Sequence, residues 1–181
     1  MILETKRLIL RPWELSDASS LYQYASDPDV GPSAGWAVHT DIDDSRRVIR
    51  EILSKPETYA VVRKGTDEAV GSISLMFGAD NMSGKDSEPE LGYWIGKPFW
   101  GNGYIPEAAE CLIRRAFADL NADAVWCGYY EGNDKSRRVG EKCGFSYVRT
   151  NPRGDTQLGY TLPEIETKIL REQWLSRVKS I

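Results

Sequence analysis

Two short segments of the chain hold residue types that could bind an anion or move a proton. The first, residues 90–109, reads Glu-Leu-Gly-Tyr-Trp-Ile-Gly-Lys-Pro-Phe-Trp-Gly-Asn-Gly-Tyr-Ile-Pro-Glu-Ala-Ala. Its apolar start is typical of a strand, and Gly101 and Gly103 lie in a loop before a stretch with helical periodicity. The first N–H groups of a helix lack internal partners, and the helix dipole adds partial positive charge there. The segment therefore predicts a strand, loop and helix suited to an anion such as a pyrophosphate.

The glycine loop alone does not identify the ligand, because a turn that only starts a helix has the same pattern. No Gly-Lys-Ser/Thr follows it, which excludes a P-loop. Pro106 stands where a dinucleotide-binding fingerprint requires its third glycine. Pro106 suits the first turn of a helix, because its missing N–H would have no partner there.

The second segment, residues 133–145, combines a helix cap with a hydroxyl group. Asn133 can cap a helix that Gly144 ends, and Ser136 lies one turn inside that helix. Asn133 could be a cap only, and Ser136 an exposed helical serine. Beside a ligand, the Ser136 hydroxyl could instead donate a hydrogen bond.

The elements that must position these segments follow from periodicity and breaker residues. Ser16 or Asp17 caps a first helix that stops at 27–29, and a capping box at 161–164 starts the last helix. Loops are expected at 30–40 and at 78–88, the second of them mobile. Strands are expected at 7–12, 58–63, 69–77, 89–96, 124–130, 145–150 and 157–162, and further helices at 41–54, 105–120, 133–143 and 162–178. This order predicts an α+β fold with a mixed sheet, without the regular alternation of a doubly wound fold.

Length and charge restrict the class of protein. A chain of 181 residues suits one domain over 1–181. Its 23 basic and 27 acidic residues give a net charge of −4, which argues against a dedicated nucleic-acid binder. No stretch approaches the roughly 18 apolar residues of a membrane span. Charges at residues 4–7 stand where a signal peptide needs apolar residues, so we expect a cytoplasmic protein.

Taken together, the segments resemble the GCN5-related N-acetyltransferase (GNAT) superfamily, and within it the ribosomal-protein N-terminal (alanine/serine) acetyltransferase group. The resemblance runs over nearly the whole chain, through 4–12, 90–95, 100–108 and 133–145. The superfamily's cofactor loop reads Arg/Gln-x-x-Gly-x-Gly/Ala. Here Trp100 occupies the Arg/Gln position and Ile105 the small-residue position, as in the ribosomal-protein group. Backbone amides are therefore expected to dominate the pyrophosphate contacts.

The resemblance implies an acyl-CoA N-acyltransferase fold, with a mixed, mostly antiparallel, splayed sheet of about six or seven strands flanked by helices. It implies acetyl-coenzyme A as cosubstrate and no metal. The pantetheine arm would bond to the backbone of residues 93–95. The cofactor-binding residues expected on this basis are Trp94, Ile95, Trp100, Gly101, Asn102, Gly103, Tyr104, Ile105, Asn133, Ser136 and Arg138.

The resemblance also suggests catalytic roles. Glu90 is the candidate general base, although it could instead recognise a cationic substrate. Ser136 could protonate the leaving thiolate, with Tyr130 in reserve, or it could bind the cofactor only. Trp36 and His39 would contact the acceptor together with Glu90; a loop-stapling role for His39 is the alternative.

The acceptor is expected to be a primary amine: a protein N-terminus, a polyamine or a small molecule. The competing hypothesis is a non-catalytic coenzyme-A-binding sensor or interaction module. No nucleic acid or membrane partner is expected, and the protein is expected to be a monomer or homodimer.

Overall fold

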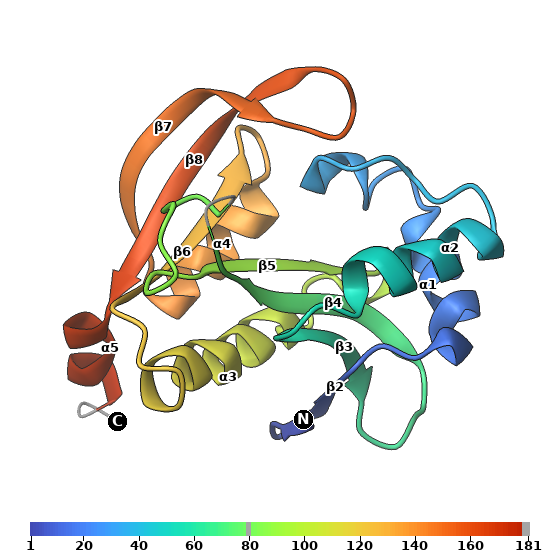
Figure 1. The fold of residues 1–181 in the computed structure, drawn as a ribbon, viewed down its shortest axis with the longest axis horizontal. Coiled ribbons are helices and arrows are strands. Elements are labelled where there is room, and N and C mark those ends of the chain that lie inside the picture. Colours follow the sequence, from blue (N-terminus) through green and yellow to red (C-terminus); the bar gives the residue numbers. More distant parts are fainter. Residues whose placement is uncertain (79–80, 179–181) are drawn as a thin grey trace.

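One mixed sheet organises the chain in the computed structural model, which describes residues 1–78 and 81–178 (Figure 1). Within that part, eight strands follow the order β1-β2-β3-β4-β5-β6-β8-β7. All neighbours are antiparallel except β5 and β6. The strands are β1 (Leu3–Glu4), β2 (Leu8–Arg11), β3 (Thr58–Arg63), β4 (Ala69–Met76), β5 (Glu90–Ile95), β6 (Ala124–Tyr130), β7 (Ser146–Asp155) and β8 (Thr161–Leu170).

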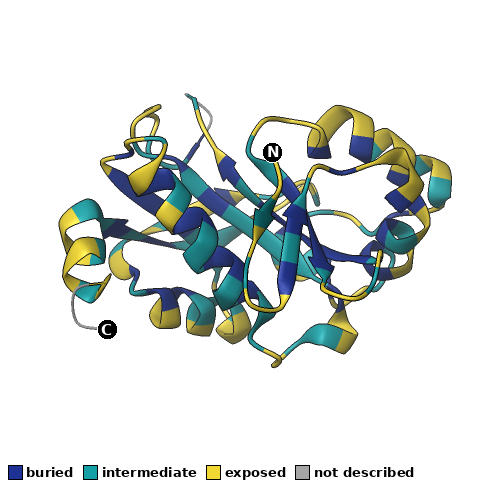
Figure 2. Ribbon diagram, turned by 90° about the horizontal axis from the view of Figure 1, so that it is seen from below, coloured by how far each residue is buried: buried dark blue, intermediate teal, exposed yellow. Residues whose placement is uncertain are grey.

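Helices cover both faces of this sheet. In Figure 1, α3 lies along one face of the strands β2 to β5, and α1 and α2 lie at the opposite side. Viewed from below in Figure 2, the helices expose their outer residues while the strands between them are largely buried. The helical segments are η1 (Leu15–Asp17), α1 (Ala18–Ala25), η2 (Pro32–Ala34), α2 (Ile42–Val48), η3 (Ile49–Leu53), η4 (Lys97–Phe99), α3 (Tyr104–Ala118), α4 (Asp134–Cys143) and α5 (Arg171–Val178).

The period of two along each strand divides the buried residues into two cores. On β3, Val61 packs in the core under α3, with Leu112 and Phe117. Its neighbours Ala60 and Val62 point to the other face and pack in the core under α1 and α2. β3 is therefore buried on both sides, which fixes its register.

The α+β fold with a splayed mixed sheet and the order of its elements are confirmed. The predicted strand at 124–130 coincides with β6. The predicted caps of α4 are also confirmed: the side chain of Asn133 accepts from the N–H of Ser136, and Gly144 has φ 82°. The eighth strand is the two-residue β1, which pairs with β2.

The predicted last helix at 162–178 and its capping box at 161–164 are wrong. Residues Thr161–Leu170 form β8, and only Arg171–Val178 are helical, as α5. β8 lies between β6 and β7 and pairs with both, so sheet pairing overrides the local capping pattern. The predicted strand at 157–162 spans the hairpin turn and only the start of β8.

The predicted strand at 145–150 is longer in the structure. β7 continues through Pro152 to Asp155. It is an edge strand, and its register with β8 shifts between Asn151 and Gly154. Proline has no N–H to donate. It is tolerated here because an edge strand with a shifted register does not need a ladder hydrogen bond at that position.

One smaller prediction, a side-chain cap of the first helix by Ser16 or Asp17, is also wrong. Asp17 is the N-cap residue of α1, but its side chain does not cap that helix. Its carboxylate accepts from the N–H of Glu14 at 2.9 Å and pairs with Arg11. In the predicted loop at 78–88, residues 79–80 lie outside the described residues. The part that follows is organised around Asn81, whose Oδ1 accepts from two backbone N–H groups.

Two glycines in the paired strands β4 and β5 give a matched test of the packing. A Cβ at Gly71 would lie 2.4 Å from the carbonyl oxygen of Trp94, whereas one at Gly92 would meet the flexible end of Met76 at 3.0 Å. We expect Gly71→Ala to lower the free energy of unfolding by about 1–3 kcal/mol, and Gly92→Ala by clearly less. Urea unfolding of both variants tests this, and equal losses would contradict the assigned β4–β5 packing.

Candidate active site

The two parallel strands in the middle of the sheet separate after one paired position. Glu90 on β5 pairs with Trp126 on β6, and no later pair follows within the described residues. A cleft of about 1050 Å³ opens beyond this point, lined by β5, the loop after it, β6, the start of α4 and the η2 segment. The separation leaves one edge of β5 without a neighbouring strand.

The register of β5 determines which backbone groups face that gap. The N–H of Gly96 donates to the carbonyl of Val70 on the β4 side at 2.8 Å, and Ser72 pairs with Trp94. Backbone groups alternate in direction along an antiparallel pair, so those of Trp94 face β4. Those of Tyr93 and Ile95 face the gap. The backbone of Trp94, from which we expected a contact with the coenzyme, is thus turned toward β4, and the groups left free are those of Tyr93 and Ile95.

The loop after β5 presents a row of unpaired amides. Gly101 and Gly103 have φ 77° and 74°, a region that side chains disfavour. Within the described part of the chain, the N–H groups of residues 101–105 have no hydrogen-bond acceptor. Gly103 is the N-cap residue of α3, so the helix dipole adds to the same site. These residues fit the diphosphate of a coenzyme.

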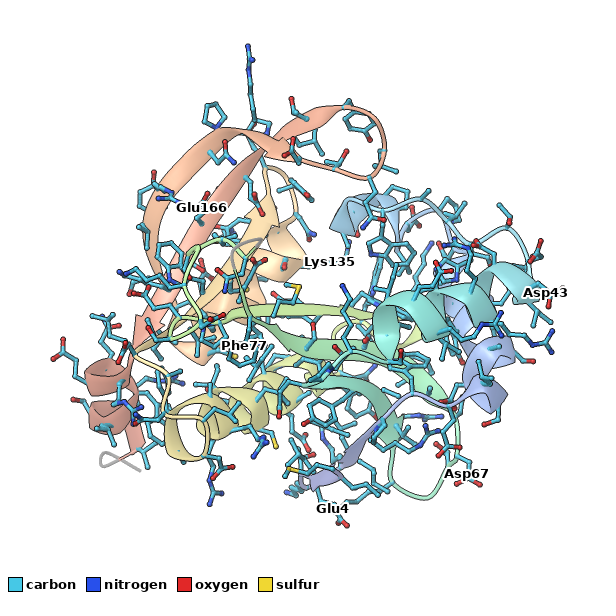
Figure 3. The ribbon with its side chains drawn as sticks, viewed as in Figure 1. Glu4, Asp43, Asp67, Phe77, Lys135 and Glu166 are labelled. Carbon is cyan, nitrogen blue, oxygen red and sulfur yellow. The ribbon has the colours of Figure 1, made fainter. Side chains whose placement is uncertain are left out.

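Trp100 orders this loop without offering a charge to it. Its indole N–H donates to the carbonyl of Ile95 at 2.9 Å. The Lys135 ammonium lies 4.2 Å from the centre of its ring. In Figure 3, Lys135 lies on the side of α4 that faces the segment containing η2. Arg138 lines the cleft one turn further along α4.

The structure connects Ser136 to a tyrosine that the sequence analysis did not select. The Oγ of Ser136 lies 2.7 Å from the Oη of Tyr93, which also lies 3.2 Å from the Ser136 carbonyl oxygen. Burial raises the pKa of Tyr93 well above its usual value, so the phenol stays protonated. Tyr93 follows Glu90 by three residues on β5. Strand periodicity places Tyr93 on the face of β5 opposite to that of Glu90, but the contact of that face with α4 comes only from the fold.

Both polar atoms of the Asn133 side chain make a structural hydrogen bond. Its Oδ1 caps α4 by accepting from the N–H of Ser136 at 3.1 Å. Its Nδ2 donates to the carbonyl of Ser33 in η2 at 2.9 Å. A second bond crosses between the same two parts of the molecule, from the N–H of Gln157 to the carbonyl of Gly35 at 2.7 Å. Asn133 thus joins α4 to the opposite wall of the cleft.

Two carboxylates line the cleft near the branch point of the sheet. The Oε2 of Glu90 accepts from the N–H of Met82 at 2.8 Å, and burial raises the pKa of Glu90. Glu164 on β8 lies over Gly128, where a Cβ would come within 2.6 Å of its Oε1. Burial, followed by the charges of Glu90, Glu166 and Asp155, raises the pKa of Glu164 to about 7.

Glu164 and Glu166 differ in their partners although both belong to β8. Glu166, labelled in Figure 3, is buried and forms an ion pair with Arg149 at 2.6 Å. Glu164 has no side-chain hydrogen bond or ion pair among the described residues. Glu164 was not predicted as a site residue, because residues 161–164 were assigned to a helix cap. Recognition of residues 161–170 as a strand would have been the signal.

Aromatic side chains form another part of the cleft wall. Trp94 packs against Trp13 and Trp36, with ring centres 6.4 and 5.8 Å apart. His39 contacts Trp36, and its Nδ1 lies 2.8 Å from the Oγ of Ser45. Burial lowers the pKa of His39, which keeps the ring neutral. Trp36, His39 and Trp94 all line the cleft, and His39 also ties the loop to α2.

The hydroxyl of Tyr130, the reserve proton donor, already donates a hydrogen bond within the protein. It donates to the carbonyl of Asp155 at 2.6 Å.

None of the helices in the described part of the chain is long and apolar enough to cross a membrane. The described residues also contain no group of three or more His, Cys, Asp or Glu side chains placed to hold a metal ion.

Comparison with known proteins identifies the family. A family model described as an acetyltransferase (GNAT) domain matches residues 7–146. Protein p20 of Bacillus licheniformis, an uncharacterized N-acetyltransferase, is 34% identical over 128 residues, which cover 68% of this chain and 70% of p20. The chain therefore belongs to the GNAT family and is an N-acetyltransferase. Enzymes of this family use acetyl-coenzyme A.

Two further relatives agree with this assignment. YdaF of Bacillus subtilis, provisionally named a ribosomal N-acetyltransferase, is 40% identical over 75 residues, 41% of each chain. A GNAT-family acetyltransferase structure from Bacillus anthracis superposes with a TM-score of 0.82 at 23% identity, covering 95% of this chain and 99% of that one. The splayed sheet is therefore the fold of this family.

The half-buried carboxylate of Glu164 predicts a pH-dependent stability. Its folded pKa of about 7 lies above the usual 4.5, so the folded state retains a proton that the unfolded state releases. The free energy of unfolding should therefore fall as the pH rises from 4.5 through 7. We expect Glu164→Gln to have a higher Tm than the parent at pH 8 and an equal Tm near pH 4. Thermal unfolding between these values measures the difference. The exposed Glu131→Gln serves as control, and parallel pH profiles for parent and Glu164→Gln would contradict the assignment.

Proposed function

We propose that this protein transfers an acetyl group from acetyl-coenzyme A to a primary amine that attacks the thioester directly. One observation carries the proposal: the same cleft contains unpaired amides, on the free edge of β5 and in residues 101–105, and the carboxylate of Glu90. A protein N-terminus, a polyamine and a small-molecule amine are the acceptor classes. Glu90, Glu164 and the tryptophan wall favour an acceptor that arrives as a cation.

Bound acetyl-coenzyme A supplies the acetyl group as an activated thioester. The backbone groups of Tyr93 and Ile95 would hold the pantetheine arm, and the amides of residues 101–105 would hold the pyrophosphate. Arg138, with Lys135 beside it, supplies positive charge at the mouth of the cleft. The Asn133 Oδ1 accepts one hydrogen bond, so its second lone pair leaves room for one more.

The amide of Tyr93 or Ile95 also has a role in the reaction. A backbone N–H aimed at the thioester carbonyl oxygen stabilises the negative charge that develops there. Such a donor is worth about 2.7–4 kcal/mol of barrier. The strand is held by β4 along its other edge, so the donor is positioned before the substrate binds.

Glu90 accepts the proton that the acceptor must lose before it can attack. An ammonium has no lone pair, so a base must act directly or through one water. Burial raises the pKa of Glu90 and brings it nearer to neutral pH, which improves its basicity as an acceptor of that proton. The Met82 N–H holds one carboxylate oxygen and leaves the other available.

Ser136 holds the proton that the departing sulfur needs. Tyr93 remains neutral because of its high pKa. Either hydroxyl can be the donor in the contact between Tyr93 and Ser136; in this scheme Tyr93 donates to the Ser136 Oγ and fixes the hydroxyl in place. The Ser136 O–H is then free to point at the sulfur. Ser136 is the proton donor in this scheme and Tyr93 is a positioning residue.

A non-catalytic coenzyme-A-binding module has no support from the relatives, which are named as N-acetyltransferases. The cytoplasmic location, the single domain over 1–181 and the state as monomer or homodimer stay predictions. The same holds for the absence of nucleic-acid and membrane partners.

The direct test measures thiol release from acetyl-coenzyme A with a panel of amines. Glu90→Gln keeps the size of the side chain but removes its basicity. On the best acceptor we expect kcat/KM to fall by about 100-fold or more at pH 7 and to recover partly near pH 10, where the free amine is abundant. Glu164→Gln is the matched comparison, because it removes the neighbouring carboxylate. If Glu90→Gln stays within about threefold of the parent, the general-base role is wrong.

A further inference from the structure

The guanidinium of Arg7 lies against the glycine loop, although Arg7 comes from the far end of the sequence. Its Nη1 donates to the carbonyl oxygen of Asn102 at 2.9 Å, and its Nε donates to Glu107 at 2.6 Å. Its guanidinium carbon also lies 4.6 Å from the centre of the Tyr104 ring. One side chain thus contacts three residues of the loop and helix start.

We infer that Arg7 is a positioning residue for the coenzyme: it fixes the direction in which the Gly103 N–H points. A trans peptide unit is planar, and its C=O and N–H point in opposite directions. The bond from Arg7 holds the Asn102 carbonyl on one side of the loop. The Gly103 N–H, in the same peptide unit, must therefore point to the other side. There it has no acceptor among the described residues.

The loop needs such a restraint because of its composition. Glycine populates positive and negative φ about equally, so the peptide between Asn102 and Gly103 would otherwise rotate easily. Gly101 stands on the other side of the same segment, with φ 77°. A rotated peptide would present the Asn102 carbonyl, a partial negative charge, to the anion. Arg7 stabilises the one orientation that presents a donor.

Arg7 is itself held firmly. The Oε1 of Glu107 accepts from the backbone N–H of Arg7 at 2.7 Å and from the Thr5 hydroxyl at 2.6 Å, while its Oε2 accepts from the Nε. Glu107 belongs to the first turn of α3. The bond to the Nε restrains the guanidinium directly, and the other two join the chain before β2 to the helix start.

The inference rests on the proposed function, because it assigns the loop to the coenzyme's pyrophosphate. Acetyl-pantetheine, which lacks the phosphates, separates the two questions. For the parent we expect kcat/KM to be far higher with acetyl-coenzyme A than with acetyl-pantetheine. The ratio of the two values is the readout, because a general loss of folded protein lowers both values together and leaves their ratio unchanged.

Arg7→Met removes the bond to Asn102 and should lower this ratio by about tenfold, the effect of losing a charge-assisted hydrogen bond. Arg7→Lys keeps the charge but lacks the fork that reaches Glu107 and Asn102 together, so it should resemble Arg7→Met. The matched control is Arg11→Met. Arg11 is on the neighbouring strand β2 and forms a similar clamp with Asp17, with bonds of 2.7 Å, but does not contact the loop. It should lower Tm and leave the ratio unchanged.

The possible failures are distinguishable. A parent that uses both thioesters equally well would contradict the assignment of the loop, and with it the proposed function. A parent that discriminates, together with an Arg7→Met variant that discriminates equally, would overturn the role of Arg7 alone. Full recovery of the ratio in Arg7→Lys would also overturn it, because charge and not direction would then be the cause.

Discussion

The loss of pairing between β5 and β6 after Glu90 and Trp126 is the constraint on which the site depends. Each strand keeps a partner on its outer edge, β4 for β5 and β8 for β6, so the sheet remains stable around the gap. Inside the gap, backbone donors and acceptors have no strand to bond. Buried polar groups without partners cost free energy, so the gap favours a ligand with amides and carbonyls of its own.

The proposed catalytic groups lie around the gap between β5 and β6. Glu90 lies at the branch point, where the two strands still touch. Ser136 lies on α4, across the gap, and is joined to β5 through Tyr93. The unpaired amides of residues 101–105 continue from the open end of β5. The separation of β5 from β6 thus creates the binding surface and sets the distance between the proposed base and the proposed proton donor.

Local signals in the sequence predicted the parts of this site that are local in the structure. The caps of α4 and the glycine loop before α3 depend on residues within one turn, and both were predicted correctly. The strand β8 was missed because its stability comes from β6 and β7, whose partner residues no local pattern contains. Glu164 was lost with it. The contacts of Arg7 with Asn102 and Glu107 join residues about 100 positions apart, so only the fold reveals them.

Amide hydrogen exchange, measured by NMR with and without coenzyme A, tests the central claim most directly. If the coenzyme occupies the gap, exchange should slow at Tyr93, Ile95 and residues 101–105, whose N–H groups are unpaired in the free protein. Trp94 should be unaffected, because its backbone already faces β4. Protection confined to other segments, with coenzyme binding demonstrated in the same sample by calorimetry, would contradict the account.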